Sequence, residues 1–342
     1  AVDQNGQKRK FGSRKHYSFS HKGYQKESQR ITRAVAERYG NNSFVQAWQT
    51  DNEFGCHETT YSWCQSSLQE FRNWLEVKYQ SIEKLNEEWG NVFWSMEYSS
   101  FEDIDLPNLT VTEANPAHHF AFRRFSSDQV KNFNSQQVKI INQFSPNRPV
   151  SHNYMGHFVE FDHYKVSEDL DIAAWDSYPL GYLQNMQSIA REDKKLLFEC
   201  YNIGDPDFQA YHHDLYRGMG RLWVMEQQPG TVNWARYNPI PLPGAVRMWT
   251  WEAFAHDAEV VSYFRWRQAP YAQEQMHAGL MHCDNSSAMG SKEALQVSKE
   301  IQEIELPPTQ KAEIALLHDY EACWMTEIDG QTQDFHYTRL ML

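Results

Sequence analysis

Five short apolar runs, each closed by polar or charged residues, constrain the fold of this chain most strongly. They lie in SFVQAWQTDNE (43–53), RPVSHNYMG (148–156), LDIAAWDSYPLG (170–181), RLWVMEQQPG (221–230) and AEVVSYFRW (258–266). Segments of helical character surround them, at 25–38, 66–80, 117–143, 207–217 and 243–255. Strands that alternate with helices are typical of βαβ units, and such units build a parallel sheet.

The polar residues that close these runs predict a (β/α)8 TIM barrel, because catalytic residues of that fold lie at the carboxyl ends of its strands. Glu53, Asn153, Asp176 and Glu226 are examples. A closed barrel needs eight strands, and the chain opens with a loop-like stretch before the first of the five runs. We therefore predict an α/β chain whose barrel is incomplete at its N-terminus and occupies residues 1–303.

The end of the chain carries the signals of a second domain. EIELPPTQ (303–310) has the composition of a linker, which we place at residues 304–310. KAEIALLHDYEACW (311–324) then predicts a new apolar strand. Residues 311–342 are therefore expected to begin a second α/β domain.

Charge and composition narrow the class of ligand. The formal net charge is -13, which argues against nucleic acid and against an anionic membrane surface, since both need clustered Lys and Arg. The 12 Trp and 18 Tyr favour carbohydrate, whose apolar ring faces stack on aromatic side chains, although any single Trp is more often part of a core. Five scattered cysteines form no disulfide framework, which indicates a reducing, cytoplasmic compartment.

Two glutamates suit glycoside hydrolysis, which needs two carboxyl groups flanking one bond, about 5–5.5 Å apart in retaining enzymes. Glu53 and Glu226 both close strand-like segments. Asn52 could hydrogen-bond a sugar 2-hydroxyl, and Trp234 could form a stacking platform. The alternatives are a surface glutamate in a βα loop for Glu53, and an ion pair with Arg221 or Arg217 for Glu226.

A second cluster of polar residues lies in RWRQAPYAQEQMHAGL (265–280). Glu274 and His277 are three residues apart, so a helical turn would place them on one face, where they could hold two hydroxyls of one sugar. A Glu-x-x-His pair is also a metal-ligand pattern, but no matching second pair is evident. Arg14 could bind further hydroxyls, with an ordinary surface ion pair as its alternative.

Several of these segments resemble glycoside hydrolase family 42 β-galactosidases. They are FGSRKHYSFS, WQTDNEFGCHETTYSWC, WDSYPLG, DLYRGMGRLWVMEQQPGTVNW and GAVRMWTWEAFAHDAEVVSYFRWRQAPYAQEQMHAGL, between about Phe11 and Leu280. The resemblance implies strands four to eight of a TIM barrel, with an acid/base after strand four and a nucleophile after strand seven. By position these are Glu53 and Glu226, and the galactose-binding residues are Arg14, Asn52, Tyr178, Trp234, Glu274 and His277.

The chain departs from this family at a structural zinc site, which several members build from four cysteines. The matching positions are Ser18, Ser62, Cys64 and Ser67. Serine hydroxyls are poor zinc ligands, so we expect no zinc there, no metal at the active site and no cofactor. The resemblance also implies that residues from about Lys311 begin a flavodoxin-like trimerisation domain, and that the full-length protein is a homotrimer.

The resulting hypothesis is hydrolysis of terminal non-reducing β-D-galactosides by double displacement. Glu226 attacks the anomeric carbon while Glu53 protonates the leaving oxygen, and Glu53 then activates water. Two alternatives remain open at this point. One is the same chemistry on α-L-arabinopyranosides, which lack the hydroxymethyl group of galactose, and the other is a non-catalytic galactose-binding module.

Overall fold

The computed structural model describes the chain except for residues 13, 187–197, 308–311, 331 and 333–334. The described part divides into two compact units. Unit 1 comprises Ala1–Val150, Phe158–Asp169 and Asp319–Asp334, and unit 2 comprises Ser151–His157, Leu170–His318 and Phe335–Leu342.

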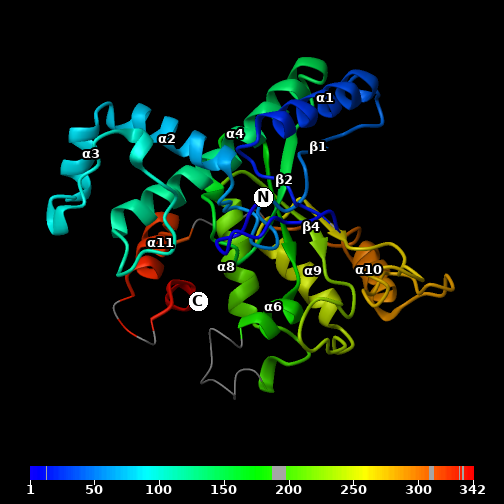
Figure 1. Cartoon of the computed structure of the whole chain (residues 1–342). Helices are drawn as coiled ribbons and strands as arrows, with labels where there is room; N and C mark the ends of the chain where they lie inside the picture. The colour runs from blue at the N-terminus through cyan, green and yellow to red at the C-terminus, as the bar shows by residue number, and fades with distance from the viewer. Residues whose placement is uncertain (13, 187–197, 308–311, 331, 333–334) are drawn as a thin grey trace. The chain divides into compact units, whose positions relative to one another are not determined.

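Five strands form one sheet in the order β1-β2-β3-β4-β5, and Figure 1 labels β1, β2 and β4. The strands are β1 (Trp48–Gln49), β2 (Val150–Met155), β3 (Ile172–Ser177), β4 (Arg221–Gln227) and β5 (Val260–Tyr263). Neighbouring strands from β2 to β5 pair in parallel. All five predicted strands are therefore confirmed, although β1 is only two residues long. Sequential parallel strands with intervening helices are the pattern of a (β/α)8 barrel, and the predicted incomplete TIM barrel is confirmed.

Burial explains why β3 is continuously apolar before its last residues. Every residue of Ile172–Ser177 is buried, as expected for a parallel strand covered on both faces. The register aligns Asp176 with Glu226 on β4, after an irregularity between Trp175 and Asp176. Polar side chains of neighbouring strands are thereby brought to the same level of the sheet.

The helices of unit 1 are α1 (Lys22–Tyr39), α2 (Gln65–Tyr79), α3 (Ile82–Trp89), α4 (Pro116–Phe144), α5 (His163–Ser167) and α11 (Tyr320–Ile328). The helices predicted at 25–38, 66–80 and 117–143 are confirmed. α4 begins where expected from its sequence, because Asn115 caps the amide of Ala117 and Pro116 occupies the first turn. Phe71, Leu75 and Phe125 lie in a fully buried cluster that joins α2 to α4.

Helix α1 is covered on a narrow face. Ala36 is buried, whereas Ile31 and Val35 are 52% and 39% exposed. The helix ends at Gly40, whose amide donates to the carbonyl of Ala36. It packs against α4.

The helices of unit 2 include α6 (Pro179–Met186), α8 (Pro206–Arg217), α9 (Ala245–Ala255), α10 (Met289–Glu300) and α12 (Tyr337–Met341). The helices predicted at 207–217 and 243–255 are confirmed. α9 begins two residues later than predicted, because Gly244 adopts φ 96° as its N-cap. Glu293 of α10 accepts from the amides of Gly244 and Arg247 at 2.8 and 2.9 Å, so a carboxylate at the positive end of the helix dipole fixes that start.

The strand predicted within residues 311–324 is wrong. Residues 312–318 form no strand, and helix α11 begins at Tyr320 with Asp319 as its N-cap. A strand needs a neighbour to accept its hydrogen bonds, and no described strand pairs with this segment. Ile314 and Leu317 are accordingly 87% and 84% exposed. Residues 308–311 of the expected linker region lie outside the described part.

No described helix is both long enough and apolar enough to cross a membrane.

Candidate active site

Arg14, Asn52 and Glu53 meet in unit 1, just after β1. Glu53 is 9% exposed, so it is not the surface glutamate of the alternative interpretation. The guanidinium of Arg14 donates to Oε2 of Glu53 at 2.9 Å, and the side-chain amide of Asn52 donates to the same oxygen at 3.2 Å. Hydrogen bonds from a charged donor to a carboxylate are among the strongest in proteins. The Glu53 carboxylate is therefore held in a defined orientation.

The backbone of this segment adopts an uncommon conformation. Asp51 and Glu53 have φ values of 48° and 44°, in the left-handed region that non-glycine residues rarely enter. The side chain of Lys15 lies beneath this turn, and its ammonium donates to the carbonyl oxygens of Asn52 and Glu53. Lys15 was not predicted as a site residue, because a lysine in a polar stretch is normally exposed.

Glu226 lies near the end of β4 in unit 2, and Tyr178 directly follows β3. The hydroxyl of Tyr178 donates to Oε2 of Glu226 at 2.5 Å. The alternative interpretation, in which Glu226 forms an ion pair with Arg221 or Arg217, is wrong. Arg221 pairs with Glu259 at 2.7 Å, and Arg217 pairs with Asp214 at 2.6 Å.

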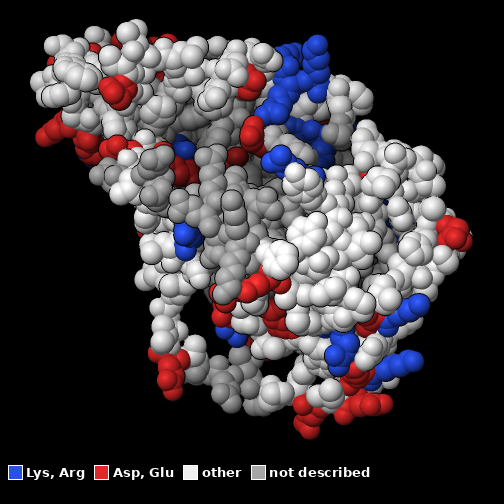
Figure 2. Space-filling view, turned by 90° about the horizontal axis from the view of Figure 1, so that it is seen from below, with Lys and Arg blue, Asp and Glu red and all other residues white. Residues whose placement is uncertain are grey.

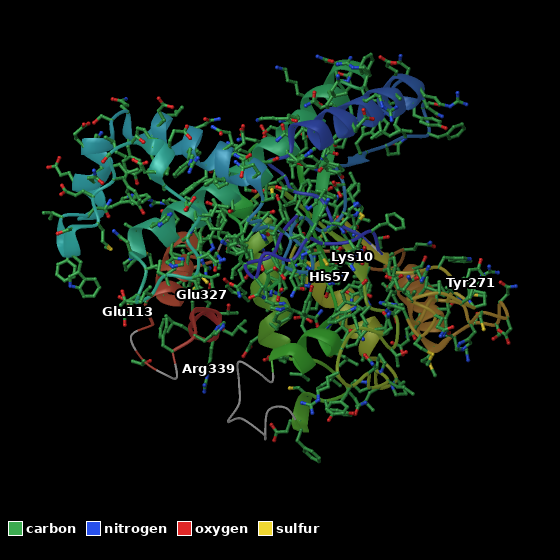
Figure 3. All side chains as sticks on the ribbon, viewed as in Figure 1. Lys10, His57, Glu113, Tyr271, Glu327 and Arg339 are labelled. Atoms are coloured by element: carbon green, nitrogen blue, oxygen red, sulfur yellow. The ribbon has the colours of Figure 1, made fainter. Side chains whose placement is uncertain are left out.

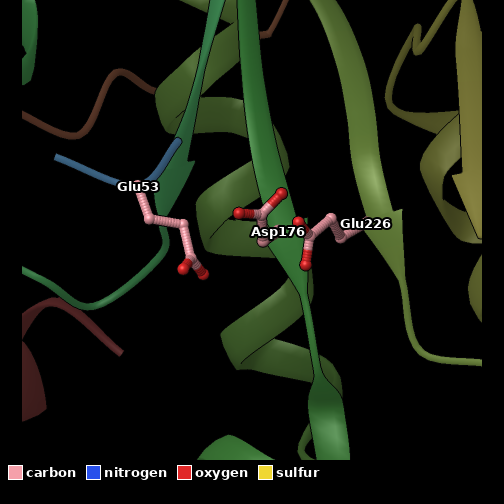
Figure 4. Close-up of side chains that lie close together, drawn as sticks. All are labelled: Glu53, Asp176 and Glu226. Atoms are coloured by element: carbon pink, nitrogen blue, oxygen red, sulfur yellow. The ribbon is translucent and has the colours of Figure 1, made fainter. Parts of the chain in front are cut away.

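Asp176 is a second acidic residue beside Glu226 that the sequence analysis did not assign to the site. The two residues are partners across β3 and β4, and a carboxylate oxygen of each lies within 4.8 Å of the other. Figure 4 draws both side chains on their strands. Asp176 is fully buried and accepts a hydrogen bond from the amide of Asn153 on β2 at 2.8 Å. Its position at the end of an apolar run was the available signal.

Aromatic side chains surround Tyr178. The rings of Trp234 and His277 lie 5.6 and 5.7 Å from it, both edge to face. Trp234 is 41% exposed, so part of its ring is available to a ligand. The other part lies against α6, where a Cβ added at Gly181 would be 2.4 Å from the Trp234 ring. Unit 2 therefore gathers Glu226, Tyr178, Trp234 and His277.

Glu274 and His277 occupy one turn and not a helix, since the amide of His277 donates to the carbonyl of Glu274 at 3.0 Å. Arg265 donates to the Glu274 carboxylate at 3.2 Å. The pKa of His277 is lowered from its usual value, mainly by burial, so the ring is neutral at pH 7. A neutral imidazole and a carboxylate are suitable hydrogen-bonding partners for sugar hydroxyls.

The four positions that match the family's zinc site lie close together in unit 1. Oγ of Ser67 is 3.2 Å from Oγ of Ser18 and 3.4 Å from Sγ of Cys64, while Ser62 accepts from the amide of Val2. Burial alone would raise the pKa of Cys64, but hydrogen bonds from the neighbouring hydroxyls lower it to about 7. One thiol and three hydroxyls do not fit zinc, which selects thiolate, imidazole and carboxylate ligands.

Comparison with known proteins places this site in a family. The family profile of glycoside hydrolase family 42, described as β-galactosidase, matches residues 1–304. The chain belongs to glycoside hydrolase family 42. A β-galactosidase of Thermus thermophilus is 51% identical over 342 residues, which cover 99% of this chain and 52% of the relative. The β-galactosidase Bga of Halorubrum lacusprofundi is 43% identical, covering 99% of this chain and 48% of the relative.

Solved structures of β-galactosidases have the same fold as this chain. The β-galactosidase from the psychrophilic Marinomonas ef1 superposes with a TM-score of 0.96 at 50% identity, covering 100% of this chain and 53% of that chain. The β-galactosidase of Halorubrum lacusprofundi gives a TM-score of 0.94 at 42% identity, covering 99% and 50%. The chain thus spans about half the length of the curated relatives it matches.

Proposed function

We propose that the protein is a retaining β-galactosidase that hydrolyses terminal non-reducing β-D-galactosides. Family membership over residues 1–304 carries this proposal. It is supported by two carboxylates at barrel strand ends, each held by a side-chain donor: Arg14 on Glu53 and Tyr178 on Glu226. On the face shown in Figure 2, uncharged side chains cover most of the described surface.

In the proposed reaction, Glu226 attacks the anomeric carbon and forms a covalent galactosyl-enzyme. Glu53 protonates the departing glycosidic oxygen, and the aglycone leaves. Glu53 then removes a proton from water, which attacks the anomeric carbon and releases Glu226. The two carboxyl groups must act from opposite sides of one sugar ring, about 5–5.5 Å apart.

The surrounding residues would bind the galactosyl ring. Arg14 and Asn52 share an oxygen of Glu53, so their other donors are placed near the acid/base. Trp234 presents half-exposed ring surface for stacking. Glu274 and His277 would accept and donate hydrogen bonds to two hydroxyls of the same sugar. Such contacts contribute to the rate when they strengthen in the transition state.

Azide rescue tests the two carboxylate assignments separately. Glu226→Ala in the complete protein should remove nearly all turnover of a nitrophenyl β-galactoside, and added azide should restore turnover with an α-galactosyl azide product. Glu53→Ala should instead give a β-galactosyl azide, because azide replaces water in the second step. Near-normal hydrolysis by Glu226→Ala, or the same azide anomer from both variants, would contradict the assignment.

Two other functions are distinguished by substrate. An α-L-arabinopyranosidase would hydrolyse nitrophenyl α-L-arabinopyranoside faster than the β-galactoside in a paired assay. A non-catalytic galactose-binding module would bind galactose without turnover by the complete protein. The side-chain partners of Glu53 and Glu226 described above favour catalysis, since a binding module needs no oriented nucleophile.

We also infer the arrangement of the complete protein. Residues 1–303 belong to the catalytic barrel, 304–310 to a linker, and 311–342 to the start of a flavodoxin-like trimerisation domain of a homotrimer. Light scattering on the complete protein should give three times the mass of one chain. The five cysteines, all unpaired, support a cytoplasmic location, where thiols stay reduced.

A further inference from the structure

A buried lysine supports the turn that carries Glu53. Lys15 is 6% exposed, which is rare for a lysine unless its charge is matched by a partner. Its ammonium donates to the carbonyl oxygens of Asn52 and Glu53, two successive residues of the same turn. The side chain thus fixes the peptide planes on both sides of the Glu53 Cα, and not the Glu53 carboxylate itself.

The turn needs such support because its conformation is intrinsically unfavourable. Asp51 and Glu53 both have positive φ values, and non-glycine residues persist there only when surrounding contacts hold them. The amide of Asn52 donates to Oδ1 of Asp51 at 2.8 Å, which closes the turn from its other side. Without Lys15, the two carbonyls that it binds would lose a charged donor, and the Glu53 carbonyl would keep its hydrogen bond from the amide of Cys56 at 3.1 Å.

The positive charge of Lys15 is opposed by a nearby carboxylate in the same turn. Burial lowers the pKa of Lys15, and the carboxylate of Asp51 is the largest opposing influence. Asp51 also interacts with the hydroxyl of Tyr17. Cys56, Glu53 and Arg14 are the other titratable groups that act on the ammonium. His57, labelled in Figure 3, lies further along the same segment, and the neighbouring Arg14 helps burial to lower its pKa.

We propose that Lys15 is a positioning residue for proton transfer, which fixes the backbone of Asn52 and Glu53 so that the Glu53 carboxyl is aimed at the glycosidic oxygen. This inference rests on the proposed role of Glu53 as acid/base. Arg14 sets the orientation of the carboxylate within the turn, whereas Lys15 sets the position of the turn. Lys15 itself does not touch the substrate.

The consequence is a defect that depends on the leaving group. Proton donation requires heavy atoms within hydrogen-bond reach, so a displaced Glu53 would slow the departure of a basic alkoxide. A dinitrophenolate leaves without protonation, and its departure would be little affected. A general loss of folded protein, in contrast, lowers the rate for every substrate by the same factor.

The test compares kcat/KM for methyl β-galactoside and 2,4-dinitrophenyl β-galactoside in Lys15→Met of the complete protein. We expect the ratio of the two values to fall at least tenfold relative to the unaltered protein. Because the ratio is taken within one preparation, it does not depend on the fraction of active enzyme. Lys15→Arg, which retains a cationic donor, should recover part of the ratio.

Lys22→Met is the matched control, since Lys22 belongs to the same unit, is exposed and pairs with Glu70. Its ratio should be unchanged. Equal losses for both substrates in Lys15→Met would reduce Lys15 to a stabilising residue and overturn the proposal, as would no loss for either. Failure of the unaltered protein to hydrolyse either galactoside would instead overturn the proposed function, and this inference with it.

Discussion

The hydrogen bond from Tyr178 to Glu226 makes a quantitative prediction for Tyr178→Phe. The substitution removes a donor 2.5 Å from Oε2 of the proposed nucleophile and keeps the ring that packs against Trp234 and His277. In the proposed second step Glu226 is the leaving group, and negative charge returns to its carboxylate. We therefore expect the Tyr178 hydroxyl to stabilise this transition state more than the covalent ester that precedes it.

Hydrogen bonds to charged groups contribute about 1.5–3 kcal/mol. At about 1.4 kcal/mol per factor of ten in rate, the loss corresponds to a fall in the breakdown rate of about tenfold to hundredfold. With 2,4-dinitrophenyl β-galactoside, whose first step is fast, this breakdown limits kcat. We expect kcat to fall by that factor, KM to fall with it, and a burst of dinitrophenolate to precede the steady state.

The assay is stopped-flow absorbance at the dinitrophenolate band, with steady-state measurements on the same samples. Tyr263→Phe is the control. It also removes a part-buried hydroxyl, which contacts Thr250 at 2.8 Å between β5 and α9, but Tyr263 has no proposed role in the reaction. A Tyr178→Phe protein whose kcat stays within twofold of the unaltered value would refute the reasoning. Equal falls in both variants would do the same.

Three further predictions concern unit 2. Arg265→Ala removes the 3.2 Å ion pair with Glu274, so KM for a β-galactoside should rise several-fold in initial-rate assays while kcat changes less. Gly181→Ala puts a methyl group 2.4 Å from the Trp234 ring, so the ring must move, and galactose should bind about tenfold more weakly in calorimetry. Burial lowers the pKa of His213 to about 3. In the unfolded chain a histidine takes up a proton near pH 6.5, so the neutral His213 contributes fully to the free energy of unfolding above that pH. On acidification this contribution is lost at about 1.4 kcal/mol per pH unit down to about pH 3. His213→Gln should therefore flatten the dependence of the unfolding free energy on pH, as measured by urea unfolding.

The strands were predictable because each lies in a short stretch that is rich in apolar residues and closed by polar ones. β3 shows the reason, since every one of its residues is buried and all are apolar before its last two, Asp176 and Ser177. The same logic found Glu226, which follows a Leu-Trp-Val-Met run. Strand identity and the residues at strand ends are therefore local information that a sequence carries directly.

Features that depend on contacts between distant segments were not predictable. Lys15 is 38 residues from Glu53, and nothing in its local sequence shows that it is buried. The Tyr178 contact with Glu226 spans 48 residues, and the sequence suggested only that both belong to a sugar site. The apolar run 312–318 met the local criteria for a strand but has no described neighbour to pair with.

Covalent trapping tests the central claim most directly. The complete protein should be inactivated by 2,4-dinitrophenyl 2-deoxy-2-fluoro-β-galactoside, since the fluorine slows breakdown of the galactosyl-enzyme more than its formation. Peptide mass spectrometry should then find one fluorogalactosyl group per chain, on Glu226. A label on Glu53 or on any other residue, or hydrolysis of β-galactosides by a protein that this reagent never labels, would contradict double displacement through Glu226.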